Sequence, residues 1–243
     1  MRVRVQDPKQ IIEKALKDGR KFLLEPEAKS LCVHYSISVP KFMVVNDLES
    51  AIKAAHELGY PVVLKVVSPD IIHKSDVGGV ILNINSEEEL KEAYERLIDN
   101  VRQKAPHARI LGVLIEEQVP KSVEVIIGVT KDPQFGHVIM FGLGGIFVEV
   151  LEDVTFRILP INKKDALEMI SEIKGYSILK GYRGRAGVDI NAIADIMVKV
   201  SRIVMENPMI RELDLNPVMV YERGAKVVDA RIILNEYVEK TGG

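Results

Sequence analysis

The sequence predicts an α+β protein built from two α+β subdomains. Up to about residue 110, helical and strand patterns alternate along the chain, which is typical of a sheet covered by helices. Beyond that point apolar strand patterns follow one another across short turns, so antiparallel neighbours are expected. With 243 residues the chain can form two such units. We therefore divide it into an N-terminal helical extension (1–21), a first subdomain (22–110) and a second subdomain (111–243).

Helix caps and apolar periodicity set the elements of the first half. Asp7 before Pro8 predicts a helix start, because proline fits the first helical position. Ser86 and Glu89 have the spacing of a capping box and open another helix. Further helices are expected over 25–38, 46–59 and 86–104, and strands over 40–45, 61–67 and 79–84.

The second half is dominated by strands and ends in a hairpin. Four strand patterns precede two helical segments, and Asn207-Pro208 closes the second helix. A turn at Arg223-Gly224 then joins the last two strands. The predicted strands are 110–119, 123–132, 137–145, 155–161, 210–221 and 225–234, and the helices are 162–173 and 189–208.

Composition excludes several classes of function. Hydrophobic residues make up 47% of the chain and charged residues 28%, as in a soluble globular protein. A net charge of −2 gives no reason to expect nucleic-acid binding. No apolar run approaches the roughly 18–20 residues that span a bilayer, so we expect no membrane partner and a cytoplasmic protein. The single cysteine, Cys32, lies in an apolar helical pattern that favours a buried structural thiol over a catalytic one.

The C-terminal hairpin carries acids on one face. Glu212, Asp214 and Asn216 alternate in "ELDLNP", so their side chains point the same way from a strand. Counting back from the turn, we expect Asp229 on the returning strand to pair near residues 216–218. Such a carboxylate and amide can hold Mg²⁺, which fills its other positions with water and phosphate oxygens. The alternative is a polar outer face without a ligand.

Charged residues in apolar strands suggest a nucleotide. Lys65 interrupts "PVVLKVV", either as an edge-strand lysine or as a cation for phosphate. Arg157, on another apolar strand, can grip a phosphate in two places. Glycines in "FGLGG" allow close backbone approach, although any tight hairpin can contain them. Glu149 and Asp153 follow those glycines.

Acidic residues also lie where the two predicted subdomains meet. They are either solvated charges or acceptors for a ribose hydroxyl and an adenine amine, with backbone groups of Gln118 and Val119 also available. The residues are Glu116, Glu117 and Glu124. Together with the cations and the metal ligands, they match what phosphoryl transfer from a nucleotide requires.

The loop "SPDIIHKSDVGG" places His73 between charged neighbours. The histidine is either a surface residue or a reacting group, since imidazole is a good nucleophile near neutral pH. The loop runs from Ser68 to Val77, so its apex can travel on the order of 15 Å at about 3.3 Å per residue. Gly78 and Gly79 form either a hinge or a tight turn into the next strand.

These segments resemble the ATP-grasp fold, with its nucleotide site in the cleft between two subdomains. Within that fold, "VVLKVVSPDIIHKSDVGGV", "MFGLGGIFVEVLEDVTFRI", "LKGYRGR" and "ELDLNPVMV" resemble the β subunit of ADP-forming acetyl-CoA (acyl-CoA) synthetases, relatives of succinyl-CoA synthetase. The resemblance covers the chain from about Phe22 to Val238.

The resemblance implies a chemistry and a set of roles. The family converts acyl-CoA, phosphate and ADP into acid, CoA and ATP through phosphohistidine. It implies that His73 carries the phosphoryl group, that Asp214 orients phosphohistidine, and that Asn216 and Asp229 bind Mg²⁺. The remaining implied contacts of ATP or ADP are Lys65 and Arg157 for phosphate, Glu116, Glu117, Gln118 and Val119 for adenine, and Glu124 for ribose.

The resemblance also implies a partner. The chain matches only the nucleotide half of the family, and it lacks a G-x-G-x-x-G at a first strand. We therefore expect a separate CoA-binding α subunit that carries the first phosphohistidine, in an α₂β₂ heterotetramer. Two alternatives are a stand-alone ATP-grasp ligase or kinase, which would not need His73, and a regulatory subunit that senses nucleotide.

Overall fold

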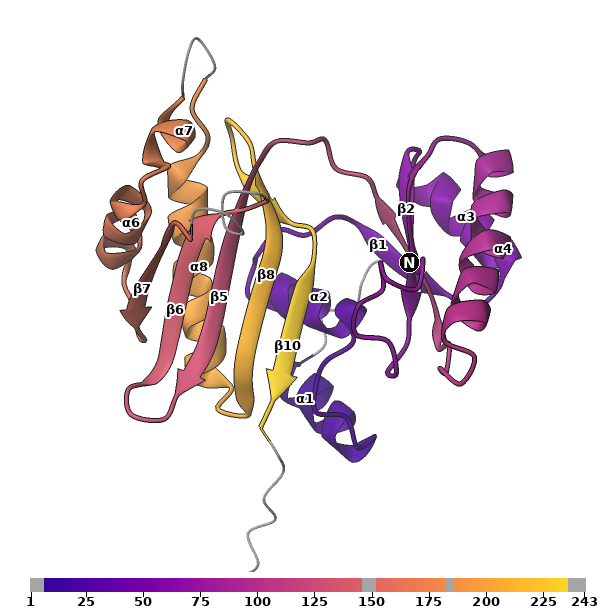
Figure 1. Ribbon diagram of the computed structural model, residues 1–243, viewed down its shortest axis with the longest axis horizontal. Helices are drawn as coiled ribbons and strands as arrows, with labels where there is room; N and C mark the ends of the chain where they lie inside the picture. The colour runs from indigo at the N-terminus through magenta and orange to yellow at the C-terminus, as the bar shows by residue number, and fades with distance from the viewer. Residues whose placement is uncertain (1–6, 146–151, 182–185, 236–243) are drawn as a thin grey trace, which may run out of the picture. The chain divides into compact units, whose positions relative to one another are not determined.

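The computed structural model describes residues 7–145, 152–181 and 186–235 (Figure 1). The chain forms two compact units. Unit 1 is formed by residues 40–120, and unit 2 by residues 5–39 together with 121–243. None of the helices within the described ranges has the length and apolar character of a membrane span. Glu149 and all of "YRGR" (182–185) lie outside these ranges.

Unit 1 is a four-stranded antiparallel sheet with two helices on one face. The strand order is β1-β4-β2-β3. Even-numbered residues of β2, such as Leu64, pack under the helices, while Val63 and Lys65 point to the opposite face. The elements are β1 (Phe42–Val45), α3 (Leu48–Leu58), β2 (Val62–Val67), β3 (Val80–Ile84), α4 (Glu87–Lys104) and β4 (Gly112–Glu117).

The helix ends of unit 1 follow the predicted capping signals. Asp47 accepts a hydrogen bond from the Ser50 backbone N–H at 2.7 Å and starts α3. The Ser86 hydroxyl likewise accepts from the Glu89 N–H at 3.2 Å and starts α4. The carboxylate of Glu89 reaches the backbone N–H of Asn85 at 2.8 Å instead of that of Ser86. The second half of the predicted capping box is therefore displaced by one residue.

Unit 2 is a six-stranded antiparallel sheet in the order β10-β8-β5-β6-β7, with β9 paired to β8. Figure 1 shows α8 running behind β5 and β6. The elements are α1 (Pro8–Lys17), α2 (Glu25–His34), β5 (Val123–Asp132), β6 (Gly136–Leu143), β7 (Val154–Ile158), α6 (Lys163–Glu172), α7 (Tyr176–Lys180), α8 (Ile190–Glu206), β8 (Ile210–Val220), β9 (Ala225–Val227) and β10 (Ala230–Leu234).

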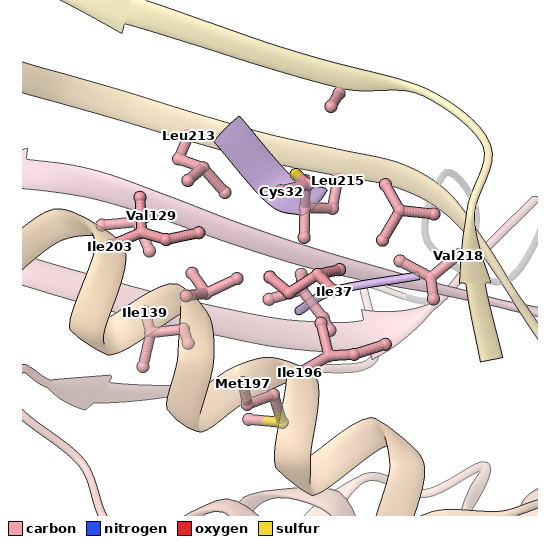
Figure 2. Close-up of a cluster of buried hydrophobic side chains, with 14 of the residues drawn as sticks. Cys32, Ile37, Val129, Ile139, Ile196, Met197, Ile203, Leu213, Leu215 and Val218 are labelled. Atoms are coloured by element: carbon pink, nitrogen blue, oxygen red, sulfur yellow. The ribbon is translucent and has the colours of Figure 1, made fainter. Parts of the chain in front are cut away.

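Within the described ranges, helices pack against one face of the unit 2 sheet. Leu213 and Leu215 of β8 lie in the same apolar cluster as Ile196 and Met197 of α8 (Figure 2). Cys32 of α2 is fully buried in that cluster, as the sequence predicted. Because side chains alternate along a strand, the residues between these leucines point to the other side, which we call the open face.

The unit boundaries differ from the predicted ones. Residues 22–39 were expected in the first subdomain, but the Leu23 N–H donates to the Ile232 carbonyl at 2.9 Å, which ties this segment to β10 of unit 2. The predicted N-terminal extension also belongs to unit 2, because Ile11 and Ala15 of α1 lie in its core. Conversely, β4 was assigned to the second subdomain but pairs with β1 and β2 of unit 1.

Candidate functional site

The open face of unit 2 carries the polar side chains of β8. Glu212, Asp214 and Asn216 border a concave region of about 390 Å³, together with apolar residues of β5, β6 and β7. Their common direction confirms the alternation expected from the sequence. Glu212 forms an ion pair with its neighbour Arg211 at 2.9 Å. Asp214 is the acid at the centre of this face, opposite Gly128 of β5 and a residue of β10.

Asp214 has an unfavourable electrostatic environment. Burial raises the pKa of its carboxyl, and the negative charge of Asp229 raises it further. Arg231, its partner across the β8–β10 ladder, opposes this shift. The negative charge of Asp229 therefore favours either a protonated Asp214 or a positive charge nearby.

Asn216 and Asp229 lie opposite each other at the end of the same ladder. The Asn216 N–H donates to the Asp229 carbonyl at 3.2 Å, so the predicted pairing is confirmed. One oxygen of the Asp229 carboxylate accepts from the Ala230 N–H at 2.8 Å. Carboxylate and amide oxygens suit Mg²⁺, which keeps most of its ligands as water or phosphate. Among the described residues, no group of three or more His, Cys, Asp or Glu side chains is arranged to hold a metal ion.

Glu124 lies at the start of β5, beside the glycine turn that follows β6. The Gly144 N–H donates to the Glu124 carbonyl at 2.7 Å. A Cβ at Gly144 would lie 2.8 Å from the Cβ of Glu124, and Gly145 has a φ of +62°. Both glycines are thus required for the turn to approach Glu124 this closely.

Arg157 lies on the opposite face of the unit 2 sheet. Its guanidinium forms an ion pair with Glu172 of α6, which raises the pKa of Arg157. Its neighbour Phe156 borders the open-face concavity instead. The structure therefore does not bring Arg157 to the face of Asp214 and Asn216, and its phosphate role stays a prediction.

In unit 1, Lys65 and Glu116 form a buried ion pair. Lys65 Nζ lies 2.7 Å from Glu116 Oε1, and the two side chains are 8% and 1% exposed. Both project from the sheet face away from α3 and α4, because Lys65 pairs with Leu114 and Val63 with Glu116. The side chain that was expected to contact adenine thus neutralises the lysine that was expected to contact phosphate. Sequence spacing did not reveal this pairing.

The residues after Glu116 are partly engaged within unit 1. The Glu117 N–H donates to the Lys41 carbonyl at 2.9 Å. The Gln118 N–H donates to the Pro61 carbonyl at 3.0 Å, and its side-chain amide exchanges two hydrogen bonds of 2.6 Å with Asn83. These bonds fix the course of the chain into Val119, which is half-buried. Of the backbone N–H groups expected at an adenine, that of Gln118 is taken.

His73 is exposed on the loop between β2 and β3 of unit 1. Within the described part of the chain, its ring has no hydrogen-bond or ion-pair partner. Gly78 has a φ of +67°, and a Cβ there would lie 2.8 Å from Asn100 Nδ2. A Cβ at Gly79 would lie 2.6 Å from the Val66 side chain. The two glycines therefore make a tight turn into β3, which was one of the two predicted alternatives.

One buried acid acquires a role only in the structure. Asp153 is 6% exposed and accepts hydrogen bonds from the backbone N–H groups of Lys174 and Gly175, each at 2.7 Å. It thereby ties the segment before β7 to the start of α7. The sequence marked Asp153 only as one of several acids, because its partners lie about twenty residues away.

The model of the ATP-grasp domain family matches residues 14–234 of the chain. The β subunit of ADP-forming acetate–CoA ligase I from Pyrococcus furiosus is 53% identical, over 95% of this chain and 99% of its own length. The ADP-forming acetate–CoA ligase I from Archaeoglobus fulgidus is 47% identical over 94% of this chain, which corresponds to only 33% of that longer protein.

Solved structures of acetyl-coenzyme A synthetase 1 from Ca. Korarchaeum cryptofilum are also similar. One, with coenzyme A and Ca-AMPCP, has a TM-score of 0.92 at 50% identity and covers 94% of this chain and 100% of that one. Two others, at 48% identity and the same coverage, have TM-scores of 0.88 and 0.83. In the first of these the phosphohistidine segment is phosphorylated in a site I orientation, and in the second, with Mg-AMPPCP, it points towards the nucleotide-binding site.

Proposed function

The chain belongs to the ATP-grasp domain family and, within it, to the β subunits of ADP-forming acetate–CoA ligases, and from this we propose how its residues act. It is the nucleotide-binding subunit of an acid–thiol ligase that exchanges a phosphoryl group between phosphohistidine and ADP or ATP. The main observation behind these roles is that His73 is exposed on a loop. The chain is also 48% identical to a protein whose structure contains a phosphohistidine segment.

His73 is the phosphoryl carrier in this proposal. In the direction of ATP hydrolysis, a ring nitrogen attacks the γ-phosphorus. The bond from phosphorus to the bridging oxygen of ADP breaks, the P–N bond forms, and ADP leaves. A histidine intermediate divides one difficult transfer into two easier ones. Asp214 then accepts a hydrogen bond from the other ring nitrogen, which fixes the tautomer.

Charged side chains in both units bind the nucleotide. Lys65, held by Glu116, neutralises phosphate oxygens, and Glu124 accepts from a ribose hydroxyl. The backbone of Val119 is left to contact adenine, because the N–H groups of Glu117 and Gln118 donate within unit 1. Asn216 and Asp229 would hold Mg²⁺, which supplies charge neutralisation for the phosphates when bound. The location of the nucleotide between the two subdomains stays a prediction.

A separate subunit completes the enzyme. The Pyrococcus relative is named a β subunit, and the Archaeoglobus relative contains a region like this chain within a protein about three times as long. We propose that the remaining functions lie in a CoA-binding α subunit that carries the first phosphohistidine, in an α₂β₂ heterotetramer.

Labelling with [γ-³²P]ATP and Mg²⁺ tests this function. The wild-type chain should acquire acid-labile, base-stable label, and His73→Ala should not. A chain that turns over ATP equally well after His73→Ala would instead be a ligase or kinase with its own acceptor. A chain that binds nucleotide but never acquires label would be a sensor.

A further inference from the structure

The loop that carries His73 is tied firmly at its N-terminal end. The Asp70 carboxylate accepts three hydrogen bonds from Arg109: from the backbone N–H at 2.8 Å, and from Nε and Nη2 at 3.0 Å each. The Ser68 hydroxyl accepts from the Asp70 N–H at 3.1 Å. Ile71, the next residue, is buried in the core of unit 1. The chain is thus held in place up to Ile71.

Arg109 is itself fixed to the strand from which the loop departs. Two residues beyond it, the Leu111 N–H donates to the carbonyl of Val67, the last residue of β2, at 2.8 Å. The Asp70–Arg109 pair therefore fastens the loop's first turn to the end of the β2–β4 ladder. Charge-assisted bonds in a bidentate arrangement are about twice as strong as neutral ones.

The C-terminal half of the loop has weaker ties to the rest of unit 1. Lys104 Nζ donates to the Asp76 carbonyl at 3.2 Å, and Asn100 Nδ2 donates to the Gly78 carbonyl at 3.4 Å. Each is a single bond to a neutral carbonyl, and the second is at the long limit for a hydrogen bond. Val77 packs, partly buried, against the core of unit 1, and the Gly79 N–H donates to the Lys74 carbonyl at 2.8 Å. The Gly79 carbonyl in turn accepts from the Val66 N–H of β2 at 2.8 Å.

We propose that Asp70 and Arg109 form the pivot of the His73 segment: their ion pair stays closed while residues 72–76 move, and the contact of Lys104 and the Gly79–Lys74 hydrogen bond release. This inference rests on the proposed carrier role of His73. His73 is three residues from Asp70, so its reach from the pivot is about 10 Å at roughly 3.3 Å per residue. Asp70 and Arg109 are positioning residues, which limit the volume that His73 searches.

Kinetics of His73 labelling test the pivot. With the purified chain, [γ-³²P]ATP and Mg²⁺, Arg109→Ala should slow phosphorylation about fivefold or more at an unchanged apparent KM for ATP, because the first turn of the loop loses its attachment to Arg109 and His73 searches a larger volume. Arg109→Lys keeps the positive charge but loses the two-point contact with the Asp70 carboxylate. Its phosphorylation rate should therefore lie between those of wild type and Arg109→Ala. Lys104→Ala should label at or above the wild-type rate.

A matched control removes an exposed ion pair elsewhere in unit 1. Lys53 lies 2.6 Å from Glu49 on α3, and Lys53→Ala should label at the wild-type rate. The Arg109 side chain is 70% exposed, so its variants should keep the fold, which circular dichroism checks. Equal labelling of wild type and Arg109→Ala overturns the pivot.

Hydrogen exchange gives a second readout. Upon addition of Mg-ATP, the Arg109 amide should stay protected, while the amide of Gly79, which donates to the Lys74 carbonyl of the moving segment, exchanges faster. Acceleration of both amides together would mean that the pair opens, which contradicts a pivot. Failure of the proposed function has a different signature: the wild-type chain itself then acquires no label on His73.

Discussion

Replacing Glu116 by Gln should destabilise unit 1 although glutamine has nearly the same shape. The carboxylate lies 2.7 Å from Lys65 Nζ, and both side chains are more than nine-tenths buried. Removing one partner of a buried ion pair costs about 3–5 kcal/mol, because the other charge stays desolvated. Glutamine keeps a hydrogen-bonding oxygen, so we expect a loss near the lower end, about 3 kcal/mol. For a chain of this size, that lowers the melting temperature by roughly 6–12 °C.

A double replacement separates stability from nucleotide binding. Lys65→Met with Glu116→Leu exchanges the ion pair for apolar side chains of similar volume, a change that is often neutral or stabilising. We expect the double variant to melt at or above the wild-type temperature. It should nevertheless lose affinity for Mg-ATP, because the cation proposed to contact phosphate is gone.

Differential scanning calorimetry and isothermal titration with Mg-ATP measure both effects. Glu49→Gln, which breaks the exposed pair with Lys53, serves as the control and should change stability by about 0.5 kcal/mol or less. A melting temperature of Glu116→Gln equal to that of the wild type would contradict the predicted destabilisation. Wild-type nucleotide affinity in the double variant would remove Lys65 from the phosphate site.

Burial raises the pKa of the Cys32 thiol to about 12, so this single cysteine should resist an aromatic disulfide reagent at about pH 8 in the native protein and react fully after denaturation. Arg109 lowers the pKa of Asp70 to about 2 from 3.8, so the carboxylate stabilises the fold above about pH 4 and loses that contribution as the pH falls toward 2. The melting temperatures of wild type and Arg109→Gln should therefore differ at about pH 6 and converge at about pH 2. Asp214→Ala should keep near-wild-type affinity for nucleotide while acyl-CoA turnover, assayed with the α subunit, collapses; loss of ATP binding instead would place Asp214 in the metal site.

Features that depend on local sequence could be predicted. Asp229 pairs beside Asn216 because a short turn fixes the register of a hairpin, so counting residues was enough. The caps at Asp47 and Ser86 follow from hydrogen bonds within three residues. The common face of Asp214 and Asn216 follows from strand alternation alone.

Features that depend on distant partners could not be predicted. Strand alternation shows only that Arg157 and Phe156 point to opposite faces of the sheet. Which of these two residues faces Asp214 depends on the register of β7 against β6. The pairing of Glu116 with Lys65 likewise depends on β4 joining β2, whereas its sequence pattern matched the strands that follow it. Strand patterns identify an element, but they do not identify the sheet to which it belongs.

The two faces of β8 differ: Leu213 and Leu215 pack in the core, and Asp214 lies on the open face. Leu213 and Leu215 of β8 pack in the core, whereas the side chain of the residue between them does not contribute to that core. That residue is Asp214, in a position where burial and Asp229 raise the pKa of the carboxyl and where ionisation at neutral pH is therefore unfavourable for stability. A neutral side chain at this position would make the strand more stable than an ionised carboxylate does. Such destabilising acids are typical of positions where function requires the charge. The same argument does not extend to Arg157, whose charge is already balanced by Glu172. Burial and the charge of Asp229 thus make Asp214 the first residue of the open face to test by replacement.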